Sequence, residues 1–129
     1  MPVEWWVVFQ GISAAGAVIQ AVRSALEVRK LSREEVKAIA AKAEAEAKVV
    51  GKPAPSIDEE MREAIDKKLK RARKRWADAI DGTDDQSEWA KATDRYRSDI
   101  CAILRNIKQV NGGVLPDDLY TLWTALQCG

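Results

Sequence analysis

The sequence predicts an all-α fold, namely a single-domain antiparallel helical bundle of about five helices, three of them long and two shorter. Apolar residues recur at alternating steps of three and four, which is the spacing of one face of an α-helix. The composition is rich in alanine, glutamate, lysine, arginine and leucine, and it favours helix over sheet. With 129 residues the chain has the length of one domain, so we expect one hydrophobic core built from residues 1–129.

The first predicted helix runs from about Glu4 to Lys30 and is the most apolar part of the chain. Its apolar stripe consists of Val8, Ile12, Ala15, Ile19, Val22 and Leu26. The opposite side carries small and uncharged residues, which is typical of a helix at the centre of a bundle or beneath a second chain. A glycine inside a helix costs roughly 1 kcal/mol relative to alanine, so Gly11 and Gly16 indicate close packing against this helix.

The second predicted helix begins at Ser32, because Ser32 and Glu35 have the spacing of a capping box. It continues to about Val50 with a thin stripe of small residues: Val36, Ala40, Ala43, Ala47 and Val50. Residues 51–55 contain a glycine and two prolines, which cannot continue a helix. We therefore expect a Gly/Pro joint at 51–55 between the second and third helices.

The third predicted helix begins at Ser56, which has capping-box spacing with Glu59, and ends near Asp81 and Gly82. Its apolar stripe consists of Ile57, Met61, Ile65, Leu69, Ala72, Trp76 and Ile80. Residues 81–85 are acidic turn residues. They lack the ligand spacing of a calcium loop, so we expect a turn and no metal site there.

The core helix is predicted from Trp89 to Val110, where the apolar spacing is the most regular in the chain. Its stripe consists of Trp89, Thr93, Tyr96, Ile100, Ile103, Ile107 and Val110. The sequence Asn111, Gly112, Gly113 ends this helix, because glycine adopts the left-handed conformation that such endings often need. Pro116 then begins a last short helix with apolar leucines and Trp123.

The charge and the reactive residues exclude several functions. The net charge is only +1, so any binding to nucleic acid or membrane must be local. Histidine is absent, which removes the usual general base, and we expect no enzyme activity, no cofactor and no small-molecule substrate. Two cysteines, Cys101 and Cys128, are too few for a secreted disulfide framework. We therefore expect reduced thiols in a cytoplasmic protein.

The surplus of apolar surface on the first helix predicts a non-catalytic interaction or assembly module. Trp5 and Trp6 are adjacent and cannot both face one narrow helix side, so at least one is available to a partner. We expect the chain to self-associate or to bind a larger protein through this helix. The candidate partner-binding residues are Trp5, Trp6, Phe9, Ile12, Gly16 and Ile19.

Two alternatives use other properties of the chain. Seven of the nine residues from 67 to 75 are cations: Lys67, Lys68, Lys70, Arg71, Arg73, Lys74 and Arg75. They would suit a small helical subunit of a nucleoprotein complex that contacts the nucleic-acid backbone. The same run is also typical of a solvated helix face. Acidic residues precede it on the helix, and the helix dipole favours acidic residues near the start and basic residues near the end. The second alternative is a membrane-associated protein that uses its first helix.

Overall fold

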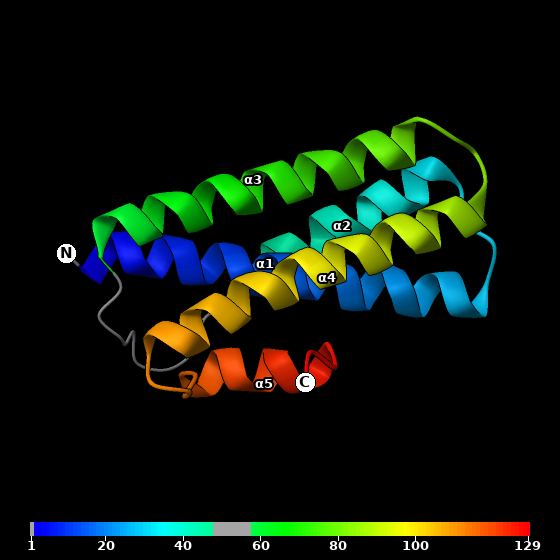
Figure 1. The fold of residues 1–129 in the computed structure, drawn as a ribbon. Helices are drawn as coiled ribbons and strands as arrows, with labels where there is room; N and C mark the ends of the chain where they lie inside the picture. Colours follow the sequence, from blue (N-terminus) through cyan, green and yellow to red (C-terminus); the bar gives the residue numbers. More distant parts are fainter. Residues whose placement is uncertain (1, 48–57) are drawn as a thin grey trace.

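The computed structural model describes residues 2–47 and 58–129, with side chains described from residue 8 onward. Five helices, and no strand, are present in these ranges, which confirms the predicted all-α bundle. The helices are α1 (Pro2–Val28), α2 (Arg33–Glu46), α3 (Glu59–Asp81), α4 (Gln86–Val110) and α5 (Asp117–Ala125). In Figure 1, α1 and α3 run in one direction, and α2 and α4 return in the other, so neighbouring long helices are antiparallel.

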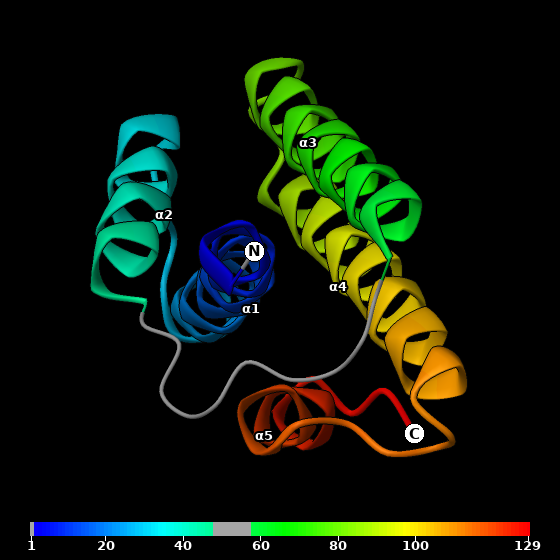
Figure 2. The ribbon, with the colours of Figure 1, turned by 90° about the vertical axis from the view of Figure 1, so that its left-hand side faces the viewer.

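Helix α1 lies at the centre of the bundle. The end-on view in Figure 2 places α2 on one side of α1, the α3–α4 pair on the other side, and α5 below it. The described apolar side chains of α1 that are buried are Val8, Phe9, Ile12, Ala15, Val18, Ile19 and Val22. The apolar side of α1 from Val8 to Val22 is therefore covered by the protein's own helices, whereas Gln10, Gln20 and Ser24 on its polar side are exposed.

The predicted start of α2 is confirmed, but the helix ends earlier than predicted. Ser32 caps α2 with the predicted capping box, in which the side chains of Ser32 and Glu35 each bind the other residue's backbone N–H. Helix α2 ends at Glu46, before the predicted end at Val50. The predicted joint at 51–55 lies outside the described residues.

The start of α3 differs from the prediction. Ser56 lies outside the described residues, and the residue that caps α3 is Asp58. An Asp58 carboxylate oxygen accepts a hydrogen bond from the backbone N–H of Met61 at 2.7 Å. The prediction that Ser56 caps this helix is therefore wrong, because a carboxylate nearer the first turn accepts the free backbone donor.

The apolar stripe predicted for the core helix is buried in α4, with one exception. Trp89, Thr93, Tyr96, Ile100, Ile103 and Ile107 are buried, and Cys101 and Leu104 join them. Val110 is 54% exposed because it is the last residue of the helix, beyond the neighbouring side chains. Gly112 and Gly113 follow it with φ of 67° and 90°, as the predicted helix ending requires.

Helix α5 is held against the bundle by apolar contacts and by a covalent bond. Leu115, Leu119 and Leu126 are buried, and the Lys108 ammonium lies 4.8 Å from the centre of the Trp123 ring. Cys101 of α4 and Cys128 form a disulfide with a Cα–Cα distance of 5.3 Å. The prediction of reduced thiols is therefore wrong, and the expectation of a cytoplasmic protein loses the support that it drew from them.

A close approach between α1 and α5 explains why position 16 is glycine. A Cβ atom added to Gly16 would overlap Leu122 Cδ1 and would lie 2.9 Å from Cδ2 and 3.1 Å from Cγ. At Gly11 the nearest atom, Leu69 Cδ1, would be 3.3 Å away. Glycine lowers the stability of the helix equally at both positions. A difference in stability between the two alanine variants therefore reports how tightly the added Cβ atom is packed.

We expect Gly16→Ala to be about 1–3 kcal/mol less stable than Gly11→Ala, because only the first change overpacks the α1–α5 contact. Chemical denaturation of both variants measures this difference. Adding Leu122→Ala to each variant is expected to remove most of it. Equal stabilities of Gly11→Ala and Gly16→Ala would contradict the described contact.

Candidate functional site

The residues predicted to bind a partner lie on α1, and most of them are part of the hydrophobic core. Phe9, Ile12 and Ile19 are each at most 2% exposed, and Gly16 is also buried, against α5. The side chains of Trp5 and Trp6 lie outside the described part of the chain. The surface predicted around residues 9–19 is thus covered by the protein's own helices, and the candidate site must be sought elsewhere.

The basic run from Lys67 to Arg75 lies on α3, and four of its seven cations form ion pairs. Two pairs are within α3, Lys70–Asp66 at 3.0 Å and Lys74–Asp78 at 3.1 Å. Two pairs join helices, Arg73 with Glu44 of α2 at 3.0 Å and Arg75 with Asp99 of α4 at 2.9 Å. These four cations therefore serve the bundle itself.

The other three cations of the run are exposed. Lys67, Lys68 and Arg71 form no ion pair with any residue in the described ranges. Helical spacing places Lys68, Arg71 and Arg75 along one side of α3, and Arg75 on this side pairs with Asp99 of α4. Part of the basic run thus remains available to an anionic partner.

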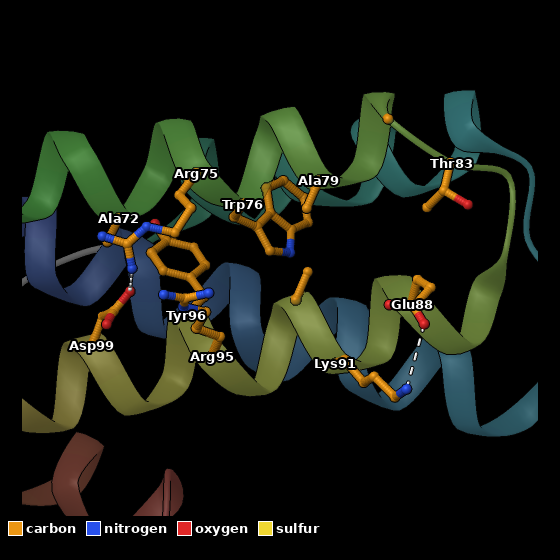
Figure 3. A pocket seen from close by; sticks show the side chains of 12 residues that line it. Ala72, Arg75, Trp76, Ala79, Thr83, Glu88, Lys91, Arg95, Tyr96 and Asp99 are labelled. Carbon is orange, nitrogen blue, oxygen red and sulfur yellow. Dashed lines mark hydrogen bonds and ion pairs between the residues drawn. The ribbon is translucent and has the colours of Figure 1, made fainter.

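A groove, here called the α3–α4 groove, lies between α3 and α4, and Arg75 of the basic run lines it (Figure 3). Its volume is about 450 Å³. The lining residues include three alanines, Ala72, Ala79 and Ala92, above the buried rings of Trp76 and Tyr96. The small alanine side chains leave space between the two helices, and this space makes the groove.

The floor of the groove is rigid because its aromatic rings are anchored. The Trp76 indole N–H donates to Thr93 Oγ1 at 3.0 Å, and the Thr93 hydroxyl donates to the Trp89 carbonyl at 2.8 Å. The Trp76 and Tyr96 rings pack with their centroids 6.1 Å apart. The Trp76 indole N–H and the Thr93 hydroxyl are thus both hydrogen-bonded, which restricts the Trp76 ring to one arrangement.

The rim of the groove is more cationic than anionic. Arg75, Lys91 and Arg95 line it, together with the carboxylates Glu88 and Asp99. The carboxylates are engaged, Glu88 with Lys91 at 3.4 Å and Asp99 with Arg75 at 2.9 Å. Arg95 is exposed and forms no ion pair with any described residue. Together with Lys68 and Arg71, it gives this face an excess of positive charge.

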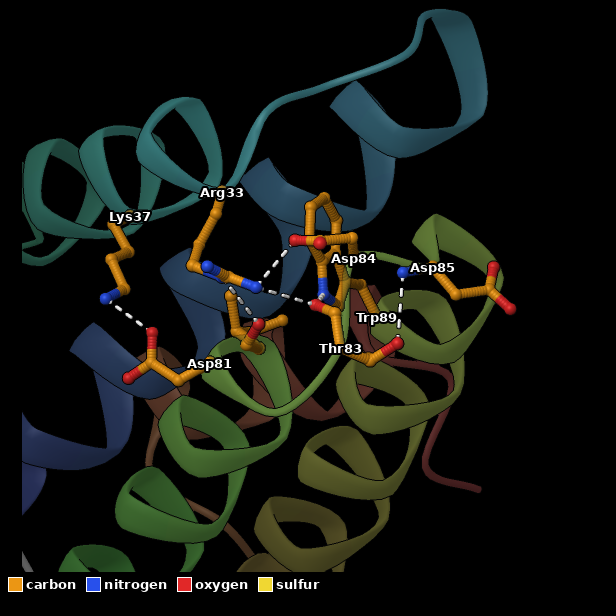
Figure 4. A network of polar contacts seen from close by, with 8 residues as sticks. Arg33, Lys37, Asp81, Thr83, Asp84, Asp85 and Trp89 are labelled. Carbon is orange, nitrogen blue, oxygen red and sulfur yellow. Dashed lines mark hydrogen bonds and ion pairs between the residues drawn. The ribbon is translucent and has the colours of Figure 1, made fainter.

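The acidic loop between α3 and α4 has a structural role (Figure 4). Arg33 of α2 pairs with Asp84 at 2.6 Å and also donates to the Thr83 carbonyl at 3.2 Å. Lys37 of α2 pairs with Asp81 at 2.5 Å. These contacts join α2 to the end of the α3–α4 pair. Over residues 2–47 and 58–129, no three or more acidic or cysteine side chains gather where they could hold a metal ion.

Sequence reasoning found the basic run but missed the α4 side of the groove. The signal was present in the spacing, because Glu88, Lys91, Ala92, Arg95 and Asp99 lie on one side of a helix. Spacing within α4 does not say which helix this side faces. Only the pairing of α3 with α4 brings Arg95 and the basic run to one groove.

Comparisons with known proteins add no information about this site. No family model, no curated protein and no solved structure matches the chain. Among the described helices, none is both long enough and apolar enough to cross a membrane. The function is therefore inferred from the geometry and charge of the described surface.

Proposed function

We propose that this protein is a non-catalytic interaction module that binds an acidic, amphipathic segment of a partner protein in the α3–α4 groove. The observation that carries this proposal is the combination of an alanine-lined groove with a cationic rim. Apolar side chains of the partner would pack on Ala79 and Ala92, which line the groove and are half-buried. Its carboxylates would face Arg71 and Arg95, which have no carboxylate partner in the described part of the chain.

The proposed contact surface differs from the one predicted on the first helix. The apolar residues of α1 from Val8 to Val22 pack inside the bundle, so a partner could reach them only if the fold opened. The α3–α4 groove is open to solvent and needs no such change. Its cations would also attract an acidic partner over a distance and speed the encounter.

A second candidate is a contact with a nucleic-acid backbone, and exposed Lys67, Lys68 and Arg71 favour it. The groove supports it less well than it supports a protein partner. Single-stranded nucleic acids stack their bases on exposed aromatic rings, and Trp76 and Tyr96 are each only 3% exposed. The alanines that line the groove suit apolar side chains better than phosphates.

Titration with a synthetic amphipathic peptide tests the proposal. The peptide carries leucines on one helical face and glutamates on the other, and a peptide of the same composition in scrambled order is the control. We expect Arg71→Glu combined with Arg95→Glu to weaken binding about tenfold or more, because two attractive contacts become repulsive. Isothermal calorimetry measures the change.

The matched control reverses two exposed lysines far from the groove, Lys30→Glu combined with Lys42→Glu. It changes the net charge by the same amount as Arg71→Glu combined with Arg95→Glu, and it is expected to alter peptide binding by less than about twofold. Equal binding of the ordered and scrambled peptides would contradict the proposal. Binding of short DNA or RNA with a steep salt dependence, in place of the peptide, would support the second candidate instead.

A further inference from the structure

A second groove, here called the α1 groove, lies on the opposite side of α3. Its floor is Gly11, Ala14 and Ala15 of α1, and Leu69, Arg73 and Ala77 of α3 line one wall. Glu44 of α2 lies at the other wall, and the volume is about 440 Å³. In Figure 2, α2 and α3 stand apart on the two sides of α1. The floor is small and apolar.

An ion pair crosses the α1 groove. Arg73 donates from Nε and Nη2 to the two carboxylate oxygens of Glu44, each at 3.0 Å. An α-helix with its side chains is about 10 Å wide, so a partner helix could not lie on α1 without breaking this pair. A small molecule could bind beneath the pair and leave it intact.

The charges around the α1 groove are balanced. Besides Arg73 and Glu44, the charged lining residues are Asp66, Lys70 and Lys74. Lys70 pairs with Asp66, and Lys74 pairs with Asp78. Each cation at the groove thus has a carboxylate partner, so the site favours a neutral ligand over an ion.

Tyr96 provides a polar group inside the α1 groove. Its side chain lines the groove and is 3% exposed, and its hydroxyl has no hydrogen-bond partner among the described residues. Burial raises the pKa of this phenol well above its usual value, while the charges of Arg73 and Glu44 act on it in opposite directions. The hydroxyl therefore stays neutral and can both donate and accept a hydrogen bond.

We propose that the α1 groove binds a small uncharged molecule that has a compact apolar body and one hydroxyl or carbonyl oxygen. The oxygen forms a hydrogen bond with the Tyr96 hydroxyl, and the apolar body packs on Gly11, Ala14 and Ala77. The volume lies in the range of about 300–1,000 Å³ that small-molecule sites occupy. This inference is independent of the proposed function, because the two grooves lie on different sides of α3.

Two probes that differ by one hydroxyl group, p-cresol and toluene, test the site. Titrations followed by chemical shifts of the protein give both dissociation constants. We expect p-cresol to bind about fivefold or more tightly than toluene, which is the effect of one hydrogen bond. Tyr96→Phe is expected to remove this preference while toluene binding persists.

Further variants locate the probes. Ala14→Leu and, separately, Ala77→Leu fill the α1 groove from two helices, and each folded variant is expected to lose binding of both probes. Ala92→Leu fills the α3–α4 groove, which Tyr96 also lines, and is expected to leave binding unchanged. No binding by either probe, a p-cresol preference that survives Tyr96→Phe, or loss of binding in Ala92→Leu alone would overturn the inference.

Discussion

Replacing Ile12 by alanine is expected to lower the free energy of unfolding by about 2–5 kcal/mol. Ile12 is fully buried at the centre of α1, the helix that all the other elements surround. The change removes apolar area and leaves a cavity among helices that are fixed by their other contacts. Urea denaturation at equilibrium measures the loss.

The matched control for Ile12→Ala is Gln20→Ala, an exposed position on the same helix. It is expected to change the stability by no more than about 0.5 kcal/mol. Light scattering of both variants separates a core role from an interface role. If Ile12→Ala changed the mass in solution but not the stability, Ile12 would be a contact between chains and the described packing would be incorrect.

Removing the disulfide by Cys101→Ala combined with Cys128→Ala is expected to cost about 3–4 kcal/mol. The cysteines are 27 residues apart, and the bond restricts that loop in the unfolded chain. It also holds the end of the chain against α4, so its loss is expected to free α5. Denaturation measures the total cost, and hydrogen exchange of the α5 amides reports the local effect.

Reduction by dithiothreitol is the control for the disulfide prediction. The reductant is expected to destabilise the native chain by a similar amount and to leave the double alanine variant unchanged. Amides of α2 serve as an internal reference, because α2 packs mainly on α1. Equal stability of the native chain with and without the reductant would show that the disulfide contributes nothing to the free energy of unfolding.

Much of the helical structure was determined by the sequence alone. The stripe from Trp89 to Ile107, the Ser32 capping box and the Gly112–Gly113 ending all agree with the structure. These features depend on residues that are at most four positions apart, so one sequence contains all the information that they need. Val110 departs from the pattern because spacing does not show where the neighbouring helices stop.

The surface and the cross-links were decided only by the tertiary structure. The spacing of residues showed that α1 has an apolar face. Whether the same chain or a second chain covers that face depends on how the helices pack. The Cys101–Cys128 disulfide and the Arg73–Glu44 ion pair join residues that are 27 and 29 positions apart. Both grooves likewise combine residues from different helices. A local sequence pattern does not predict such long-range contacts, because they follow from packing the whole chain around one core.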